Sequence, residues 1–379
     1  MSLEEQEVLE RLNVWLGMLI EAGGVDLHIK SHSPIRARFK NDIVLLSKEV
    51  ITSENIELLI RILTGKSHDK FHEEKEFDGA YSLDSKHRFR VNIYMHFNGY
   101  AIVFRLIPPY IKTIEELNLP KQMHKLAHLR RGLVLITGTT GSGKSTTLAS
   151  IIEEINQTYH RHIITIEDPV EYMYHDSLSI IEQRQIGMHT NSFSRALRAA
   201  MREDPDIIVV GEIRDLATAE SILNAVNTGH LVFSTAHTLD ARDTIDSMIS
   251  LFPTEEQNRV RTTLASTLEA VISQRLVKGV TEEMIPAVEM MFMTPMIKEL
   301  IRAERDNEIP DIIKKEGTRG SITFDQALFN LALSGKITED QAYEYATSPA
   351  DLKVMFTMSP EYESKRKRKK RLEKAVWLK

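Results

Sequence analysis

Ten residues near the middle of the chain carry its most specific chemical signal. The stretch GTTGSGKSTT, residues 138–147, fits the phosphate-loop pattern, in which two glycines, a lysine and a serine or threonine stand at fixed places. Backbone N–H groups of such a loop bind phosphate oxygens, and the following helix directs its positive end at the same anion. The residues expected to hold the nucleotide are Gly138, Thr140, Gly141, Ser142, Gly143, Lys144, Ser145 and Thr146.

Two side chains of this loop have separate tasks. Lys144 would bring a full positive charge to the β and γ phosphates, and Ser145 would give a hydroxyl ligand to Mg²⁺. An apolar run precedes the loop and a helical segment follows it, as the pattern requires. We therefore expect ATP and Mg²⁺ as cofactors, with Ser145 as the metal ligand.

Hydrolysis needs a carboxylate that positions or polarises the attacking water near the γ phosphate. The segment DIIVVGEIRD ends its apolar run at Glu212, and IITIEDPVEY places Glu167, Asp168 and Glu171 after another apolar run. Any one of these carboxylates could instead cap the next helix or pair with Arg214. As a group, they predict a hydrolytic site.

The segment NTGHLVFSTAHT adds His230 and His237 on either side of an apolar run. Single histidines are usually structural or surface residues, so these two are candidates for the site and no more. Their spacing does not match a zinc motif, and we expect no metal other than Mg²⁺.

The elements that must position these residues form an α/β pattern. Short apolar runs of the kind buried on both faces of a parallel sheet alternate with helical stretches; they are GLVLITG, HIITIED, DIIVVGE and HLVFSTAH. In such a doubly wound sheet, ligands bind at the carboxyl ends of the strands, where the candidates stand. From about residue 254 onward we expect mostly helix, including residues 255–276, 295–304 and 323–335.

The first part of the chain alternates differently and predicts a separate α+β domain. Helical spacing covers residues 5–22 and 54–65, and strand-like alternation covers residues 25–30, 35–39, 42–46, 88–96 and 100–107. Pro108 and Pro109 can continue neither a helix interior nor a strand ladder, so we place a linker there. A loop within one domain is the alternative.

Composition limits the class of protein. With 379 residues, 42% of them hydrophobic and 27% charged, the chain suits two or three globular domains. It contains no cysteine, no long uninterrupted apolar run and an acidic amino-terminal stretch unlike a signal peptide, which together predict a cytoplasmic protein. The net charge of −6 argues against a nucleic-acid partner.

Four motifs follow one another along the chain in a specific order: GTTGSGKST, IITIEDPVEY, DPDIIVVGEIRD and TGHLVFSTAHT. Together they closely resemble the Walker A, Asp box, Walker B and His box of the secretion ATPase superfamily, and most closely the type IV pilus retraction ATPases of the PilT kind. The likeness extends over residues 23–328 and includes RFRVN, RALRAAMREDPDI and AVISQRL. Kinases and small GTPases share the phosphate loop but not this order.

This resemblance implies a hexameric ATPase motor that powers pilus retraction. Glu212 would be the catalytic glutamate, and Glu167, His230 and His237 would surround the γ phosphate. Two arginines of the amino-terminal domain, Arg90 and Arg105, match those that reach the nucleotide in this family. The implied architecture is a PAS-like domain over residues 1–106, a linker over 107–113, a RecA-like ATPase domain with a helical end over 114–345, and an extension over 346–379. The implied partners are further copies of the chain and an inner-membrane platform protein, at the cytoplasmic face of that membrane.

Some residues depart from the retraction pattern. Asn98 stands in the turn where an arginine is common, and MIKELIRA, residues 296–303, replaces AIRNLIRE. Together with the long carboxyl-terminal end, these changes resemble accessory paralogues of the PilU kind, whereas REDPD and GEIRD resemble PilT. The absence of a tetracysteine module favours retraction over assembly. The alternatives are an accessory subunit of a paralogous motor or another secretion or translocation ATPase.

Seven consecutive basic residues, KRKRKKR at positions 365–371, stand near the end of this acidic chain. They could form a solvated end. They could also attach to anionic lipid, at about 1 kcal/mol per basic residue near the surface, with Trp377 and Leu378 as interfacial anchors.

Overall fold

The computed structural model describes residues 2–40, 42–84, 86–281, 283–315 and 320–362, and the basic segment 365–371 lies outside these ranges. Contacts divide the chain into two compact units. The first consists of Met1–Ile111, Glu167–His175 and Arg184–Asn191, and the second of Lys112–Ile166, Asp176–Gln183 and Ser192–Lys379. Within the described ranges, no helix combines the length and apolar composition that crossing a membrane requires.

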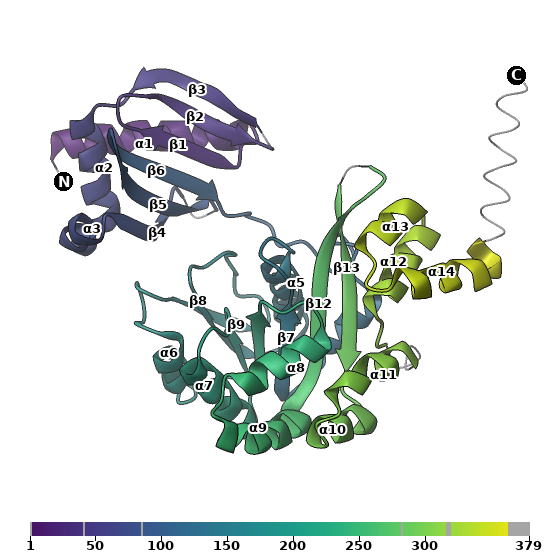
Figure 1. Cartoon of the computed structure of the whole chain (residues 1–379). Helices are drawn as coiled ribbons and strands as arrows, with labels where there is room; N and C mark the ends of the chain where they lie inside the picture. The colour runs from purple at the N-terminus through teal and green to yellow at the C-terminus, as the bar shows by residue number, and fades with distance from the viewer. Residues whose placement is uncertain (1, 41, 85, 282, 316–319, 363–379) are drawn as a thin grey trace, which may run out of the picture. The chain divides into compact units, whose positions relative to one another are not determined.

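The first unit contains a six-stranded sheet in the order β3-β2-β1-β6-β5-β4 (Figure 1). Its strands are β1 (Asp26–Lys30), β2 (Pro34–Phe39), β3 (Asp42–Val50), β4 (Glu76–Ser82), β5 (Arg88–His96) and β6 (Gly99–Leu106). Its helices are α1 (Leu3–Glu21), α2 (Ser53–Thr64), the 3₁₀ turn η1 (Gly65–Ser67) and α3 (His68–Glu74). The expected helices and strands are confirmed; β4 and α3 were not foreseen.

Alternation along the strands separates an apolar face from a polar one. On β5, Phe89, Val91 and Ile93 are almost fully buried, and they join one core cluster with Leu12 and Ile56 of α1 and α2. The residues between them on β5 lie on the opposite face. The apolar pattern therefore fixes which side of the sheet the helices cover.

The second unit contains a seven-stranded sheet in the order β13-β12-β7-β11-β10-β8-β9. Its strands are β7 (Gly132–Thr137), β8 (His162–Glu167), β9 (Ile180–Gln185), β10 (Ile207–Val210), β11 (Leu231–Ala236), β12 (Leu268–Lys278) and β13 (Met284–Phe292). Adjacent strands from β12 to β8 pair in parallel, and β13 pairs antiparallel with β12. The predicted parallel α/β core is confirmed within a mixed sheet.

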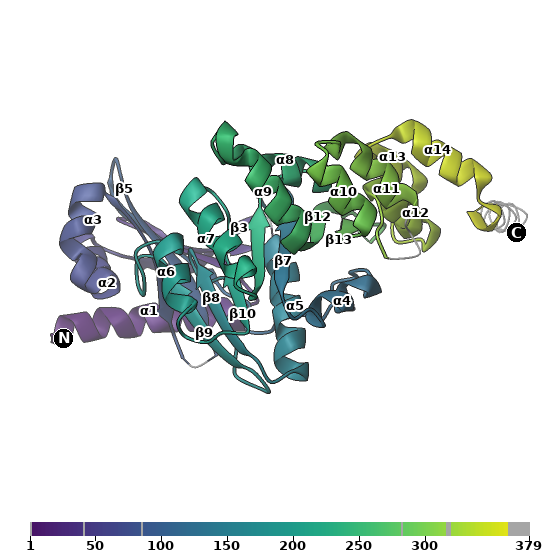
Figure 2. The ribbon, with the colours of Figure 1, turned by 90° about the horizontal axis from the view of Figure 1, so that it is seen from below.

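Helices cover both sides of this sheet (Figure 2). They are η2 (Lys121–Met123), α4 (His124–Ala127), α5 (Lys144–Thr158), α6 (Phe193–Ala200), α7 (Leu216–Asn227), α8 (Ala241–Ser250) and α9 (Thr254–Thr267). The connection through α5 leads from β7 across to β8, and that through α7 leads back from β10 to β11. Right-handed crossovers therefore put α5 and α7 on opposite faces.

The expectation of helix over residues 255–276 is wrong in its second half. Helix α9 ends at Thr267, and Leu268 begins the strand β12. This strand pairs with β7 on one side and with β13 on the other, and its apolar residues are buried except Leu276, which is partly buried. An apolar run of this length is compatible with a buried helix or a buried strand. Here it forms a strand because it is hydrogen-bonded to β7 and β13.

The end of the described chain consists of α10 (Pro295–Arg302), η3 (Asp306–Glu308), α11 (Ile309–Lys315), α12 (Phe324–Leu333), α13 (Glu339–Tyr345) and α14 (Pro349–Met358). The last three of these helices pack on the hairpin of β12 and β13. Leu352 and Phe356 of α14 join a buried cluster with Val277 of β12 and Ile285 of β13. Helix α14 is thus part of the folded second unit.

Candidate nucleotide-binding site

The phosphate loop leaves β7 at Thr137 and enters α5 at Lys144. Two of its glycines, both at positive φ, lie against Gln274 of β12. Gly138 has φ 141°, and a Cβ atom there would lie 2.3 Å from the carbonyl oxygen of Gln274. Gly143, with φ 88°, is the N-cap of α5, and a Cβ there would lie 2.8 Å from Gln274 Nε2. Side chains at these positions would push the loop away from β12.

Lys144 lies within the curve of the loop. Its Nζ donates to the carbonyl oxygens of Gly138 at 2.8 Å and Thr139 at 3.0 Å, and the residue is buried. Because the ammonium group is held by the loop itself, it is positioned before any phosphate binds. No side-chain hydrogen bond caps the start of α5, and the N-terminus of a helix is a common binding place for an anion.

Gln274, on β12, supports the loop and was not foreseen. Its Nε2 donates to the carbonyl oxygen of Ser142 at 2.7 Å, and its Oε1 accepts from the Thr147 hydroxyl at 2.7 Å. Gln274 is only 3% exposed, so both halves of its amide are committed to the loop and to α5. The sequence signal that could have revealed it is a glutamine inside the largely apolar segment 270–276.

Glu212 and His237 come together at the same sheet edge. Strands β10 and β11 are parallel neighbours that end at Val210 and Ala236, so the residues just after them meet. His237 Nε2 lies 3.2 Å from Glu212 Oε2, and Arg214 Nη2 lies 2.5 Å from Glu212 Oε1. Ala236 also pairs with Thr137, the residue before the phosphate loop. The expected carboxylate and histidine therefore share one edge with the loop.

His230 is placed elsewhere. It precedes Leu231, the first residue of β11, and its Nδ1 lies 3.1 Å from the carbonyl oxygen of Ala225. A strand of six residues is about 20 Å long. Within one copy of the chain, His230 is therefore at the opposite end of β11 from His237. The expectation that both histidines surround one γ phosphate is not met within a single chain.

By contacts, the other expected residues are grouped with the first unit, Glu167 among them although strand β8 belongs to the second sheet. Glu167 is the last residue of β8, and its Oε2 accepts from the backbone N–H of Glu171 at 3.3 Å. Arg90 and Arg105 stand directly opposite each other on β5 and β6. Arg105 is bound through Nε at 2.7 Å and Nη2 at 3.2 Å to the buried carboxylate of Asp26. The structure thus pairs the two arginines on the polar face of their own sheet.

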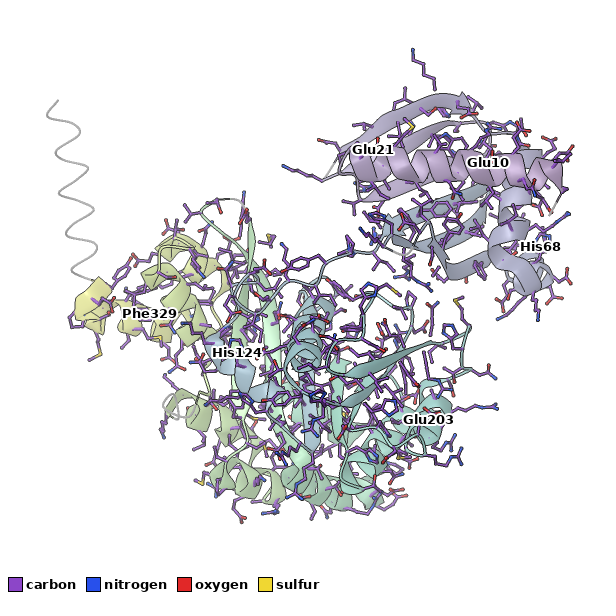
Figure 3. All side chains as sticks on the ribbon, turned by 180° about the vertical axis from the view of Figure 1, so that it is seen from behind. Glu10, Glu21, His68, His124, Glu203 and Phe329 are labelled. Carbon is purple, nitrogen blue, oxygen red and sulfur yellow. The ribbon has the colours of Figure 1, made fainter. Side chains whose placement is uncertain are left out.

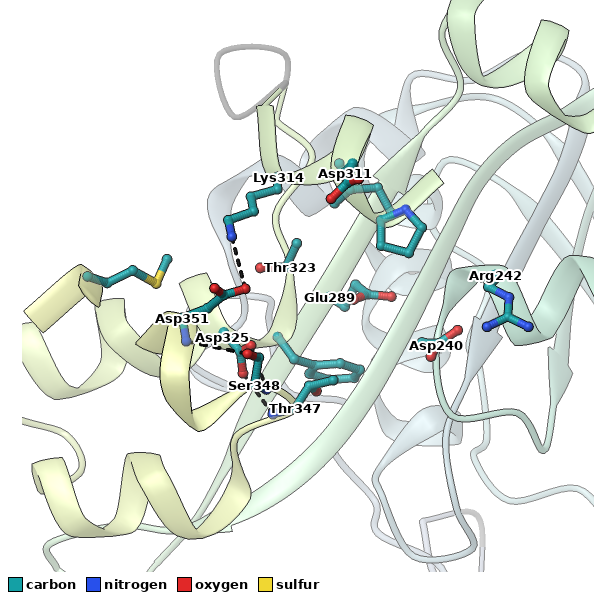
Figure 4. A pocket seen from close by; sticks show the side chains of 14 residues that line it. Asp240, Arg242, Glu289, Asp311, Lys314, Thr323, Asp325, Thr347, Ser348 and Asp351 are labelled. Atoms are coloured by element: carbon teal, nitrogen blue, oxygen red, sulfur yellow. Dashed lines mark hydrogen bonds and ion pairs between the residues drawn. The ribbon is translucent and has the colours of Figure 1, made fainter. Parts of the chain in front are cut away.

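A cavity of about 220 Å³ lies between β13, α8 and the carboxyl-terminal helices (Figure 4). Glu289 points into it, and Glu289 Oε1 accepts from the N–H of Ala241 at the start of α8 at 3.0 Å. Burial raises the pKa of Glu289 to about 7, and Asp240 nearby adds to the rise. Sequence reasoning did not single out this carboxyl group.

This raised pKa makes stability depend on pH. The folded pKa of about 7 exceeds the unfolded value of 4.5, so the folded state binds the proton more tightly. The contribution is full below about pH 4.5 and is lost as pH rises to about 7, by an amount on the order of 3 kcal/mol. Glu289→Gln removes this loss. The free energy of unfolding in urea should therefore rise for the variant relative to the wild type as the pH goes from about 4.5 to about 7. If the free energies of unfolding of the variant and the wild type changed in parallel with pH, this account would be contradicted. The same relative rise in the exposed control Glu299→Gln would also contradict it.

Comparison with known proteins agrees with this geometry. A family model described as Type II/IV secretion system protein matches residues 2–323, and the chain belongs to this family. It is 39% identical over 335 residues to the type IV pilus retraction ATPase PilT of Pseudomonas aeruginosa, a match that covers 88% of this chain and 97% of PilT. The type IV pilus ATPase PilU of the same organism is 34% identical over 348 residues, which cover 91% of each chain.

A solved structure extends the likeness to three dimensions. The crystal structure of the pilus retraction motor PilT with bound ADP matches with a TM-score of 0.83 and 38% identity, over 89% of this chain and 97% of that one. The family resemblance drawn from the four motifs is therefore confirmed. The individual roles of the site residues stay predictions.

Proposed function

We propose that this chain is an ATPase motor that powers the retraction of type IV pili. The observation that carries this function is the similarity to PilT over nearly the whole length of both chains, which includes both units and not the phosphate loop alone. The shared edge of the second sheet supports it, because the loop, Glu212 and His237 meet there.

In this function the loop binds ATP and the first turn of α5 faces its phosphates. Lys144 would move from the carbonyls of Gly138 and Thr139 onto phosphate oxygens, which are stronger acceptors for an ammonium group. The uncapped helix start and the hydroxyl of Ser145 fit Mg²⁺-bound ATP. Mg²⁺, when bound through Ser145, would neutralise charge on the phosphates.

Glu212 would orient and polarise the attacking water. Its carboxylate is largely buried and is held on one oxygen by Arg214 and on the other by His237. Both contacts restrict its rotation, as positioning of a water requires. Glu167, Arg90 and Arg105 are proposed to contribute from the first unit, and His230 from a position that is not at the phosphate of its own chain.

The resemblance and the PilT relatives also support a particular assembly. We propose that the first unit is PAS-like, that the second is RecA-like, and that six copies form a ring at the cytoplasmic face of the inner membrane, against a platform protein. The boundaries at residues 106, 113 and 345 belong to this proposal. The basic segment 365–371 would add contact with anionic lipid.

An accessory role beside a paralogous motor is the second candidate. The similarity to PilU covers 91% of this chain and 91% of PilU. In addition, Asn98, Lys298 and Ala303 depart from the retraction pattern. ATPase measurements on the purified protein should distinguish the two roles. Mg²⁺-dependent ATP hydrolysis by a hexamer of this chain alone supports the motor. Hydrolysis that appears only with a co-purified paralogue overturns it in favour of the accessory role.

A further inference from the structure

Three possible metal ligands converge at the corner between α2 and α3, in the first unit. They are Glu57 of α2 and His68 and His72 of α3, and their ligand atoms all lie within 4.8 Å of one another. His68 and His72 are four residues apart, a spacing that puts both imidazoles on one face of a helix. Figure 3 labels His68 on this helix. The Glu57 and His68 side chains are 26% and 21% exposed, so two of the three ligands are mostly buried.

The distances fit one small cation. His72 Nε2 lies 3.0 Å from Glu57 Oε1 and 3.2 Å from His68 Nε2, and His68 Nε2 lies 3.4 Å from Glu57 Oε1. Zinc bonds of about 2.0–2.1 Å in a tetrahedron place the ligand atoms about 3.3 Å apart. The three atoms therefore form a triangle close in size to one face of such a tetrahedron.

A neighbouring hydroxyl sets the tautomer that a metal needs. Thr64 Oγ1 donates its proton to the carbonyl oxygen of Ile60 at 2.7 Å, so towards His68 Nδ1, at 3.4 Å, it can act only as an acceptor. His68 then carries its proton on Nδ1 and presents the Nε2 lone pair to the triangle. Metal-binding histidines are commonly oriented in this way through their second nitrogen.

We propose that Glu57, His68 and His72 bind one divalent transition-metal ion of the Zn²⁺ class, with a fourth position open to water. One carboxylate and two neutral imidazoles are ligands that this class of ion prefers. The ion would tie α3 to α2 across Gly65, whose φ of 51° breaks the helix between them. This site stands on the first unit alone and does not depend on the proposed motor function.

Zinc titration of the full-length, nucleotide-free chain against a chromophoric chelator tests this site. The wild type should bind one more equivalent of zinc per chain than His72→Gln or Glu57→Gln. The Glu57→Gln change keeps the shape of the side chain. Thr64→Val, which removes only the orienting hydroxyl, should weaken zinc binding about 10- to 100-fold. Zinc should also raise the Tm of the wild type but not that of His72→Gln.

His124 supplies a matched control. It too contacts two carboxylates, Glu154 at Nδ1 (2.8 Å) and Glu115 at Nε2 (2.7 Å), but from opposite ring nitrogens that cannot share one ion. His124→Gln should therefore bind zinc like the wild type, and tetrahedral Co²⁺ absorption should persist in it and vanish in His72→Gln. Equal zinc binding by all variants, or a loss confined to His124→Gln, would overturn the proposal.

Discussion

Glu212→Gln is expected to lower the rate of ATP turnover on the order of 10²- to 10⁴-fold and to leave ATP affinity within a few-fold of the wild type. The amide keeps the size of the side chain and can still contact Arg214 and His237, which lie 2.5 Å and 3.2 Å from the carboxylate oxygens. It cannot polarise water as a carboxylate does. Phosphate release at saturating ATP gives the rate, and titration with a fluorescent nucleotide gives the affinity.

The matched control is Glu220→Gln, which removes an exposed carboxylate from α7. It should leave both the rate and the affinity unchanged. Turnover by Glu212→Gln at the rate of Glu220→Gln would show that Glu212 is not the group that activates water. The carboxylate at Glu167 would then be the next to replace.

Lys144→Ala is expected to act on binding instead. It removes the ammonium group that the Gly138 and Thr139 carbonyls hold inside the loop. A hydrogen bond to a charged group contributes about 1.5–3 kcal/mol, which corresponds to roughly a 10- to 100-fold loss of ATP affinity. The same nucleotide titration measures it, with the exposed Lys121→Ala as control. Unchanged ATP affinity in Lys144→Ala would remove Lys144 from the site.

The nucleotide loop could be predicted from the sequence because its geometry is local. Glycine at positive φ, a following helix and a lysine at its first turn are all specified within ten residues. Glu212 and His237 could be predicted as candidates because each follows a buried strand. That they touch could not be predicted, since it depends on the order of β10 and β11 in the sheet.

The features that the sequence did not predict depend on contacts between residues that are far apart in the sequence. Gln274 supports the loop across more than a hundred residues of chain, and it stands on a strand that was expected to be helix. His230 and His237 share one motif, yet a strand separates them. His68 and His72 show helical spacing in the sequence, but the third ligand, Glu57, comes near only because Gly65 turns the chain back.

The measurement that tests the motor function most directly is a count of surface pili, with a motility assay, on cells that lack this gene. The same cells complemented with Glu212→Gln serve as the comparison. Excess pili and lost motility in both strains are the predicted result, because retraction would then require hydrolysis by this chain. Few or no pili would mean that the chain works in assembly, and unchanged pili with normal motility would contradict the motor function altogether.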